Sequence, residues 1–327
     1  MRKALVTGGA GFIGSHVVEA FLRAGFAVTV IDDLSSGFRE NVPRDVTLHV
    51  TDIASGDTTR LVRDGGFAAI AHLAAQTDVR KSVADPKQDA AVNIIGTLNV
   101  LEAVRSIPPD ERPRIVFAST GGALYGGGDT LQRPTPESAP TNPDAPYGNA
   151  KLAAEYYLAY YGRVWGVEAI TLRFGNVYGP RQNPNGEAGV IAIFSGRIVS
   201  GEPLIVYGSG DQTRDYVYVA DVADAFLAAA TQRIPGAGDI TARAFNIGTG
   251  VETSVSALIT MLGKVTSTVP FTKHEPARAG EISRSVLDAR KAREHFGWRP
   301  EVDLRRGLEL TVDWIESASL QARGEKA

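Results

Sequence analysis

Short apolar runs alternate with longer amphipathic segments through the first half of the chain. The runs have the length and the branched side chains of strands that are buried on both faces. They predict strands at Lys3 to Thr7, Ala27 to Ile31, Val46 to Val50, Ala68 to Leu73, Arg114 to Ala118 and Glu168 to Leu172. The segments between them favour helices at Ser15 to Ala24, Asp57 to Asp64, Asp89 to Val104 and Ala150 to Tyr161. This alternation predicts an α/β fold built on a doubly wound parallel sheet of the Rossmann type.

The pattern changes after Gly179, where loops rich in glycine and proline follow one another. Because loops carry specificity, this half is expected to hold the substrate as a smaller C-terminal α/β domain. We predict a nucleotide-binding domain of residues 1–175 and 215–247, and a substrate-binding domain of residues 176–214 and 248–327. The polar tail from Glu316 to Ala327 is expected to fray.

A glycine-rich turn follows the first predicted strand, with glycines at Gly8, Gly11 and Gly14. Such glycines let a pyrophosphate approach backbone N–H groups at a helix N-terminus, and let that helix pack on the strand. The second strand leads to Asp32, about twenty residues further on, where the dinucleotide fingerprint places an acid for the ribose. A carboxylate there favours NAD over NADP, and the cofactor implies hydride chemistry.

Tyr147 and Lys151 are four residues apart at the start of a predicted helix, which places them on one face. A phenol has a pKa of about 10, and a nearby ammonium is expected to lower it, so Tyr147 could accept a proton from a sugar alcohol. The pair alone also occurs by chance on amphipathic helices. The preceding cofactor pattern favours the catalytic interpretation.

Thr120 stands where the fifth predicted strand ends, the edge at which doubly wound sheets bind ligands. Its hydroxyl could share a proton with Tyr147 and the substrate, or it could only hydrogen-bond its own turn. Gly121 and Gly122 follow it and leave room for a sugar ring.

Composition narrows the class of protein. The 327 residues are 43% hydrophobic with a net charge of -3, which gives no reason to expect nucleic acid or an anionic membrane as a partner. Cysteine is absent, which excludes disulfides and thiolate sites, and the five histidines show no metal-ligand spacing. Without a signal segment or a membrane-length apolar run, a cytoplasmic protein is expected.

These motifs resemble a known family. Together the glycine turn, Asp32, Thr120, Tyr147 and Lys151 are similar to the extended short-chain dehydrogenases/reductases, NAD-dependent epimerases and dehydratases that modify nucleotide sugars. The segments Val30 to Gly37 and Thr213 to Val217 resemble the UDP-glucose 4-epimerases (UDP-galactose 4-epimerases). Many of those enzymes have a run of serines where this chain has Ser119 to Gly122, so Thr120 must supply the hydroxyl, with Ser119 a weaker substitute.

The resemblance implies site residues by position. For NAD these are Gly8, Gly11, Phe12, Ile13, Gly14, Asp32, Asp33, Leu34, Ser35, Ser36, Gly37, Asp52, Ile53, Leu73, Ala74, Ala75, Gln76, Asn93, Tyr147 and Lys151. For the UDP-sugar they are Thr120, Tyr147, Asn176, Val190, Tyr207, Arg214, Arg278, Glu281 and Ser285. The alternatives are an ion pair of Arg214 with Asp215, and packing or turn roles for Tyr207 and Asp52.

The resemblance also separates neighbouring reactions. Nucleotide-sugar 4,6-dehydratases carry an Asp-Glu pair after the threonine, because elimination needs a further acid and base. Here those positions are Gly121 and Gly122, and the glutamate that uronic acid decarboxylases place near this point is missing too. A 4-epimerase, which only oxidises and reduces one carbon, fits best. Another nucleotide-sugar epimerase or reductase, such as a UDP-glucuronate 4-epimerase, and a non-catalytic dinucleotide-binding protein are the alternatives.

Two further expectations follow from the resemblance. Ser285 matches a position that lines the sugar pocket, and its small side chain is expected to admit the N-acetylated sugars UDP-GlcNAc and UDP-GalNAc. The helices Asp89 to Val104 and Gly148 to Gly162 match those that pair in dimers of this group, so a homodimer is expected.

Overall fold

Seven parallel strands form the central sheet of the computed structural model, which describes residues 1–127, 131–184, 189–234, 239–278 and 282–324. The strand order is β11-β6-β5-β4-β1-β2-β3. The bounds in that order are Ala244–Ile247, Ala169–Phe174, Arg114–Thr120, Ala69–His72, Lys3–Thr7, Ala27–Asp32 and Thr47–Val50. This confirms the predicted doubly wound fold, and the six predicted strands lie within two residues of their expected bounds. The seventh, β11, was not predicted.

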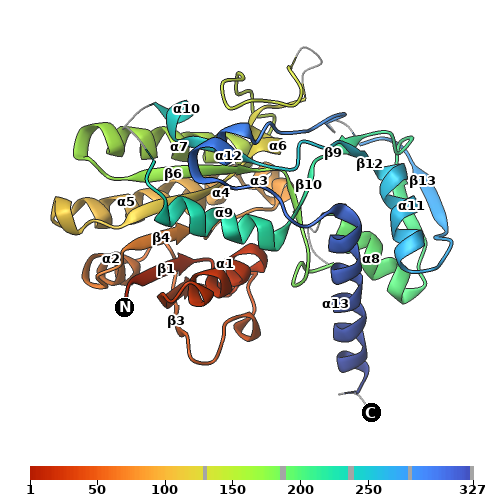
Figure 1. Ribbon diagram of the computed structural model, residues 1–327, viewed down its shortest axis with the longest axis horizontal. Helices are drawn as coiled ribbons and strands as arrows, with labels where there is room; N and C mark the ends of the chain where they lie inside the picture. The colour runs from red at the N-terminus through yellow and green to blue at the C-terminus, as the bar shows by residue number, and fades with distance from the viewer. Residues whose placement is uncertain (128–130, 185–188, 235–238, 279–281, 325–327) are drawn as a thin grey trace.

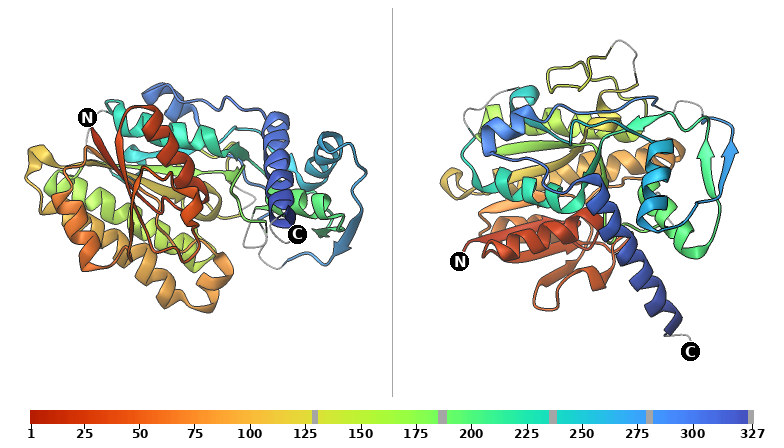
Figure 2. Two further views of the ribbon diagram at one scale, coloured as in Figure 1. Left: turned by 90° about the horizontal axis from the view of Figure 1, so that it is seen from below. Right: turned by 45° about the vertical axis from the view of Figure 1, so that its right-hand side comes forward.

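Helices cover both faces of the sheet (Figure 1, Figure 2). One face carries α1 (Phe12–Arg23) and α9 (Val219–Thr231), and the other carries α2 (Gly56–Asp64), α5 (Gly96–Arg105) and α7 (Pro146–Trp165). Side chains alternate along each strand, so Ala4 and Val6 enter the core under α1 while Leu5 enters the core on the opposite face. Two separate cores therefore hold the sheet between its helix layers.

The predicted helix from Asp89 to Val104 is interrupted. The chain forms α4 (Pro86–Ala90), a π-helical turn at Ala91–Ile95, and then α5. A π-helical turn widens the helix locally, and such turns are frequent at functional sites. Asn93 lies inside it and is buried.

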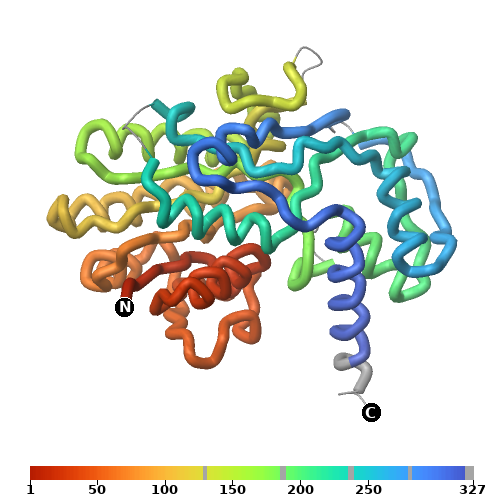
Figure 3. Tube along the Cα trace, viewed as in Figure 1, coloured from red at the N-terminus to blue at the C-terminus, as the bar shows by residue number. Residues whose placement is uncertain are grey.

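A smaller part of the molecule packs beside the carboxyl edge of the sheet, and the chain enters it repeatedly (Figure 3). Its elements are β7 (Asn176–Tyr178), α8 (Val190–Ser200), β8 (Leu204–Tyr207), β9 (Thr213–Arg214), β10 (Tyr216–Tyr218), β12 (Thr253–Ser254), α11 (Val255–Val265), β13 (Thr272–Glu275) and α13 (Leu304–Gly324). A third core, with Leu204, Leu258 and Leu308 fully buried, holds them together. A short helix, α12 (Arg290–Phe296), returns to pack on β11.

The expected fraying from Glu316 is wrong as far as Gly324, because α13 continues to that residue, and residues 325–327 lie outside the described residues. Leu308, Val312 and Ile315 recur at helical spacing and are buried, which anchors the helix through its first three turns. Residues with good helix propensity then prolong it.

Candidate functional site

The carboxyl ends of β1 and β4 form the crevice at which the strand order reverses. Gly8 turns the chain there with a φ of 72°, and a Cβ on Gly14 would lie 2.0 Å from the Gly8 carbonyl oxygen. Helix α1 then begins at Phe12 without a side-chain cap on its first N–H groups. Uncapped N–H groups beside a glycine turn are the donors that a pyrophosphate requires.

Asp32 closes the next loop onto this turn. Its carboxylate accepts hydrogen bonds from the backbone N–H groups of Ala10 and Leu34, both at 2.9 Å. Burial nevertheless raises the pKa of Asp32 above its ordinary value. Leu34 has a φ of 59°, which is uncommon for leucine and holds the predicted segment 32–37 in a tight curve.

The remaining residues of this loop support the same curve. Asp33 accepts hydrogen bonds from the backbone N–H and the hydroxyl of Ser35. Ser36 follows, and a Cβ on Gly37 would lie 2.9 Å from Ala10. The predicted ribose-binding segment therefore lies directly against the glycine turn.

A polar cluster that the sequence analysis missed supports the end of β4. The Thr7 hydroxyl lies 2.7 Å from Nδ1 of His72 and accepts hydrogen bonds from the N–H groups of Leu73 and Ala74. The other ring nitrogen of His72 lies 3.1 Å from the Thr97 hydroxyl. Burial, followed by the charge of Lys151, lowers the pKa of His72 to about 3, so its ring is neutral. The sequence signal that could have indicated this cluster is the position of His72 directly before a predicted cofactor-binding segment.

A second cluster joins Gln76 and Asn93 of the predicted nicotinamide side. The Asn93 amide exchanges hydrogen bonds with the Gln76 backbone, and both side chains donate to Oδ1 of Asp89 at 2.9 and 3.0 Å. Ala75 lies between this cluster and the end of β4. Buried Asp89 was not predicted as a site residue, although its charge acts on the residues described next.

Asp52 and Ile53 follow β3 at the adenine side. The Asp52 carboxylate accepts from the N–H of Ala54 at 2.7 Å, which is the turn role that was the alternative for this residue. Ile53 is buried, and a Cβ on Gly96 would lie 2.5 Å from its side chain. The close packing of Ile53 against Gly96 therefore holds α5 against the edge of the site.

Tyr147 and Lys151 lie on the first two turns of α7, as their spacing predicted. The Tyr147 N–H donates to the Ser82 hydroxyl, and the Lys151 ammonium donates to the Ala118 carbonyl of β5 at 2.9 Å, 6.0 Å from the Tyr147 ring centre. The expected lowering of the Tyr147 pKa is wrong for the protein alone. Burial raises it, because desolvation disfavours the phenolate, and the negative charge of Asp89 adds to this effect.

The surroundings of Lys151 also change the pKa of its ammonium group. Burial lowers the pKa of Lys151 to about 8, while the charges of Asp89 and Glu155 oppose this shift. The helix N-terminus at Pro146 adds a positive partial charge beside Tyr147. A bound oxidised nicotinamide would add a full positive charge.

Thr120 ends β5 and caps the short helix α6 (Gly121–Leu124), accepting a hydrogen bond from the Ala123 N–H at 3.2 Å. The turn role and the catalytic role are compatible, because a hydroxyl that accepts one bond still has a proton to donate. Ser119 donates instead to the buried Glu155 at 2.6 Å, so its hydroxyl is engaged away from this role.

On the substrate side, hydrogen bonds to backbone carbonyls hold three of the predicted residues in place. The Asn176 N–H donates to the Asp215 carbonyl, the Ser285 N–H donates to the Thr213 carbonyl, and Arg214 donates to the Ile282 carbonyl at 2.7 Å. The ion pair of Arg214 with Asp215, which was the alternative, does not occur between these two described residues. Asp215 instead accepts from Thr249, Gly250 and Leu287.

The predicted nucleoside-binding residues lie farther out. Val190 begins α8, and Tyr207 ends β8. The Arg278 guanidinium lies 3.8 Å above the Tyr207 ring, so one predicted phosphate ligand stacks on one predicted uracil contact. Glu281 lies outside the described residues.

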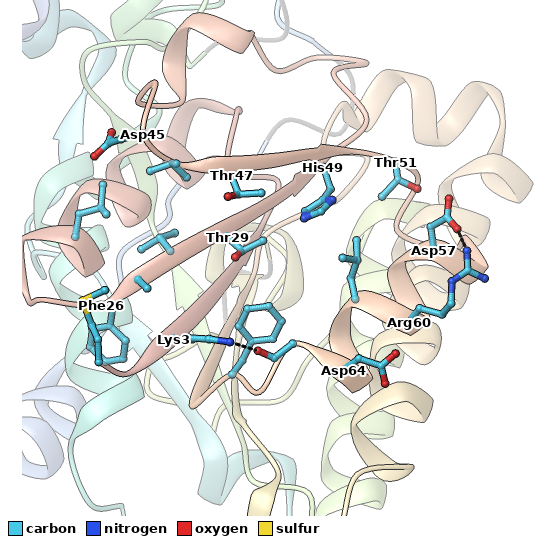
Figure 4. A pocket seen from close by; sticks show the side chains of 18 of the residues that line it. Lys3, Phe26, Thr29, Asp45, Thr47, His49, Thr51, Asp57, Arg60 and Asp64 are labelled. Carbon is cyan, nitrogen blue, oxygen red and sulfur yellow. Dashed lines mark hydrogen bonds and ion pairs between the residues drawn. The ribbon is translucent and has the colours of Figure 1, made fainter.

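A separate groove of about 870 Å³ lies beside α2 on the face of β1, β2 and β3 (Figure 4). Thr29, Thr47 and His49 point toward it from the strands, and Asp57 and Arg60 form an ion pair at its rim. It contains none of the predicted site residues. Among the described residues, no group of three metal-ligating side chains occurs and no helix has the length and apolarity to span a membrane.

Residues 4–248 match the model of the NAD dependent epimerase/dehydratase family. The chain belongs to this family. One relative in this family is a UDP-glucose 4-epimerase of Mycolicibacterium smegmatis. It is 41% identical to this chain over 322 residues, which cover 97% of this chain and 99% of that protein.

Two solved epimerase structures superpose on nearly the whole chain. That of UDP-glucose 4-epimerase with UDP-glucose from Thermotoga maritima has a TM-score of 0.90 and 41% identity, covering 97% of this chain and 99% of its own. The complex of UDP-glucose 4-epimerase with NAD from Thermus thermophilus has a TM-score of 0.87 and 42% identity, covering 97% and 100%. The glycine turn, the Asp32 loop and Tyr147 with Lys151 therefore occur in an NAD dependent epimerase/dehydratase fold along its full length.

Proposed function

We propose that this protein interconverts UDP-glucose and UDP-galactose by NAD-dependent epimerisation at C4 of the sugar. The observation that carries the proposal is that Lys151 lies 6.0 Å from the Tyr147 ring centre and binds the Ala118 carbonyl of β5, two residues before Thr120. Gly121 and Gly122, which follow Thr120, provide no further acid or base. The substrate class is supported by UDP-glucose 4-epimerases that are similar to this chain along nearly its whole length.

When bound, NAD would supply the acceptor for the hydride that the C4–H bond of the sugar gives up, and the donor that restores it. The O4 proton of the sugar passes to the Tyr147 oxygen, with Thr120 donating or accepting in the same hydrogen-bond chain. Lys151 and the N-terminus of α7 stabilise the phenolate that accepts this proton. After the 4-keto sugar presents its opposite face, Tyr147 returns the proton to O4, so no net oxidation occurs.

The nucleotide must stay fixed while the sugar turns. We infer that Asn176, Arg214 and Arg278 hold the diphosphate, since guanidinium groups offer paired donors to phosphate oxygens. Val190 and Tyr207 would contact the uracil, and Glu281 the ribose. Binding of uracil requires the Arg278 guanidinium to leave the face of Tyr207 or the base to approach the ring from its other side.

The deciding experiment incubates purified protein with UDP-galactose without added NAD and measures UDP-glucose. Formation of UDP-glucose is expected, with recovery of the starting NAD redox state. Turnover of UDP-glucuronate but of neither neutral UDP-hexose would favour the uronate epimerase instead. Failure with every UDP-hexose, even with NAD supplied, would contradict the proposal.

We further propose that N-acetylated UDP-sugars are substrates. A Cβ on Gly122 would lie 3.8 Å from the Ser285 hydroxyl, so Ser285 faces the turn that follows Thr120. A small side chain here leaves room for an acetamido group. Ser285→Tyr is expected to abolish turnover of UDP-GlcNAc while largely keeping that of UDP-glucose, whereas a wild-type enzyme that never accepts UDP-GlcNAc would refute this.

A homodimer is also proposed, through the outer faces of α7 and of the helical segment from Asp89 to Val104. Tyr156, Tyr157 and Tyr160 of α7 and Ile95 of the π-helical turn before α5 expose between 40% and 56% of their surface, which a dimer interface would bury. The cytoplasmic location and the division into two domains stay predictions.

A further inference from the structure

Helix α7 presents a third chemically active side chain beside Tyr147 and Lys151. Glu155 follows Lys151 by four residues, so all three occupy one face of the helix. Glu155 is 2% exposed and has no part in the reaction described above. A buried carboxylate next to the reacting groups requires a physical explanation.

Glu155 is saturated with hydrogen bonds from two strands. Arg173 of β6 donates to both of its oxygens, the shortest bond being 2.6 Å, and the side chains of the pair are each 1% exposed. Ser119 of β5 donates to Oε1 at 2.6 Å. The carboxylate therefore joins α7 to the ends of two neighbouring strands.

Lys151 and Glu155 bind consecutive residues of β5. Lys151 donates to the carbonyl of Ala118, and Glu155 accepts from the hydroxyl of Ser119. The next residue is Thr120. Two bonds one helical turn apart thus fix α7 in register with the strand end that carries the reactive hydroxyl.

The same network holds the far end of the turn after Thr120. Arg173 donates to the Tyr125 hydroxyl at 2.9 Å, and this hydroxyl donates to Asn246 of β11 at 2.9 Å. Tyr125 directly follows α6, the helix that Thr120 caps. The Glu155 and Arg173 pair consequently clamps the short Thr120 turn on both sides.

The charges around Lys151 make Glu155 more than a structural clamp. The negative charges of Asp89 from α4 and Glu155 from α7 favour the charged form of Lys151, whereas His72 of β4 is neutral. The positive charge of Arg173 is compensated by Glu155 itself. Tyr147 is the remaining titratable neighbour. Loss of the Glu155 charge would also leave Arg173 uncompensated, and both effects disfavour a charged Lys151.

We propose that Glu155 is a positioning residue of the reaction, which sets the register of α7 against Thr120 and keeps Lys151 charged. The reaction in this statement rests on the proposed epimerase function. The two roles can be separated, because Glu155→Gln retains a hydrogen-bond acceptor without charge, and Ser119→Ala removes the grip on β5 but leaves the ion pair intact.

The matched control is Glu168→Gln. Glu168 pairs with Arg114 at 2.7 Å and joins the opposite ends of the same two strands, far from Thr120. Its loss removes an ion pair between β5 and β6 without touching the site. We expect wild-type kcat, KM and pH dependence for this variant.

The first measurement is the pH dependence of kcat with saturating UDP-galactose. Glu155→Gln is expected to move the alkaline loss of activity down by about one pH unit. Ser119→Ala is expected to lower kcat about tenfold at every pH, with KM nearly unchanged, since small misplacement of reacting groups is that costly. Wild-type kcat and pH profiles in both variants, even with lowered melting temperatures, would reduce Glu155 to a structural role and overturn the proposal.

The second measurement does not depend on turnover. The pH titration of the Lys151 side chain is followed by NMR in protein with ¹³C-labelled lysine, with its resonance identified by loss in Lys151→Met. A lower pKa in Glu155→Gln than in wild type and Glu168→Gln is expected, and equal values would overturn the charge role. This titration stands even where the wild type fails to epimerise UDP-galactose, so failure of the proposed function and failure of this inference are distinguishable. Ser119→Ala, which keeps the ion pair, supplies the test of positioning should Glu155→Gln fail to fold.

Discussion

At the scale of single residues, Tyr147 is a phenol whose pKa the folded chain raises instead of lowering. Its environment becomes favourable to a phenolate only when positive charges outweigh burial and Asp89. Lys151 and the end of α7 provide part of that charge, and an oxidised nicotinamide would provide the rest. The phenolate is therefore most populated when the oxidised cofactor is in place, which couples proton removal to hydride transfer.

Tyr147→Phe tests this role directly. The variant is expected to keep NAD binding, because the ring and its packing remain, but to lose at least about 100-fold in kcat, the usual contribution of a positioned acid or base. Turnover and NAD affinity are measured on the same preparation. Near-normal turnover would remove Tyr147 from the reaction.

The two glycines after Thr120 differ in what surrounds them. A Cβ on Gly121 would lie 2.6 Å from the buried side chain of Leu287, whereas one on Gly122 would meet only Ser285 at 3.8 Å. Gly121→Ala is expected to destabilise the protein by about 1–3 kcal/mol through overpacking. Gly122→Ala, at a helical position without a clash, is expected to be neutral or to stabilise by up to about 1 kcal/mol. Urea unfolding of the pair measures the difference, and equal stabilities would contradict it.

At the scale of elements, α7 combines several tasks. Its inner face carries Tyr147, Lys151 and Glu155, while its outer face exposes tyrosines. The inner pair could be predicted from the sequence because four-residue spacing is a local signal. The partner of Glu155 could not, since Arg173 lies on a strand and only the parallel pairing of β5 with β6 brings it near.

The same reason explains what else was missed. Thr7, His72 and Thr97 meet across two strands and a helix, so no spacing in the sequence joins them. Strand β11 is only four residues long and directly follows the short helix α10 (Ile240–Arg243), so its apolar run was too brief for the pattern to reveal it. Strong local signals, the glycine turn and the strand-ending Asp32, were sufficient for the fold and the cofactor.

The exposed face of α7 leads to a prediction about assembly. Tyr156→Glu is expected to convert the dimer to monomer at micromolar concentration, because a charge would be buried in an apolar interface. Phe271→Glu, at an exposed residue of the smaller part, is the control and should leave assembly unchanged. Sedimentation analysis of the three proteins decides, and a monomeric wild type would refute the proposed dimer.

At the scale of the whole molecule, the free energy of unfolding is expected to depend on two histidines that are neutral in the folded protein. Burial lowers the pKa of His16 to about 4 and that of His72 to about 3, against 6.5 for the unfolded side chain. Between those values the unfolded chain binds more protons, so these two groups destabilise the fold as pH decreases from 6.5. The buried carboxylates Asp32 and Asp215 have raised pKa values and act in the opposite direction at lower pH.

A substitution isolates the histidine effect. At pH 5 His72 alone is expected to cost about 2 kcal/mol relative to pH 7. His72→Gln, which can still bond Thr7 and Thr97, should therefore lose less stability than the wild type over this range. Unfolding by urea at pH 7 and pH 5 gives both differences, and identical losses would show that His72 is not the source.

The packing of Leu287 against Gly121 also bears on how this enzyme could change through evolution. An elimination reaction would need an acidic side chain after Thr120, yet any side chain at the first of those positions collides with a buried leucine. Shrinking the leucine first would leave a cavity and a less stable protein with no new activity. An acidic side chain at Gly121 therefore requires a change at Leu287 as well, so the shape of the core limits which reactions a single substitution at this position could reach.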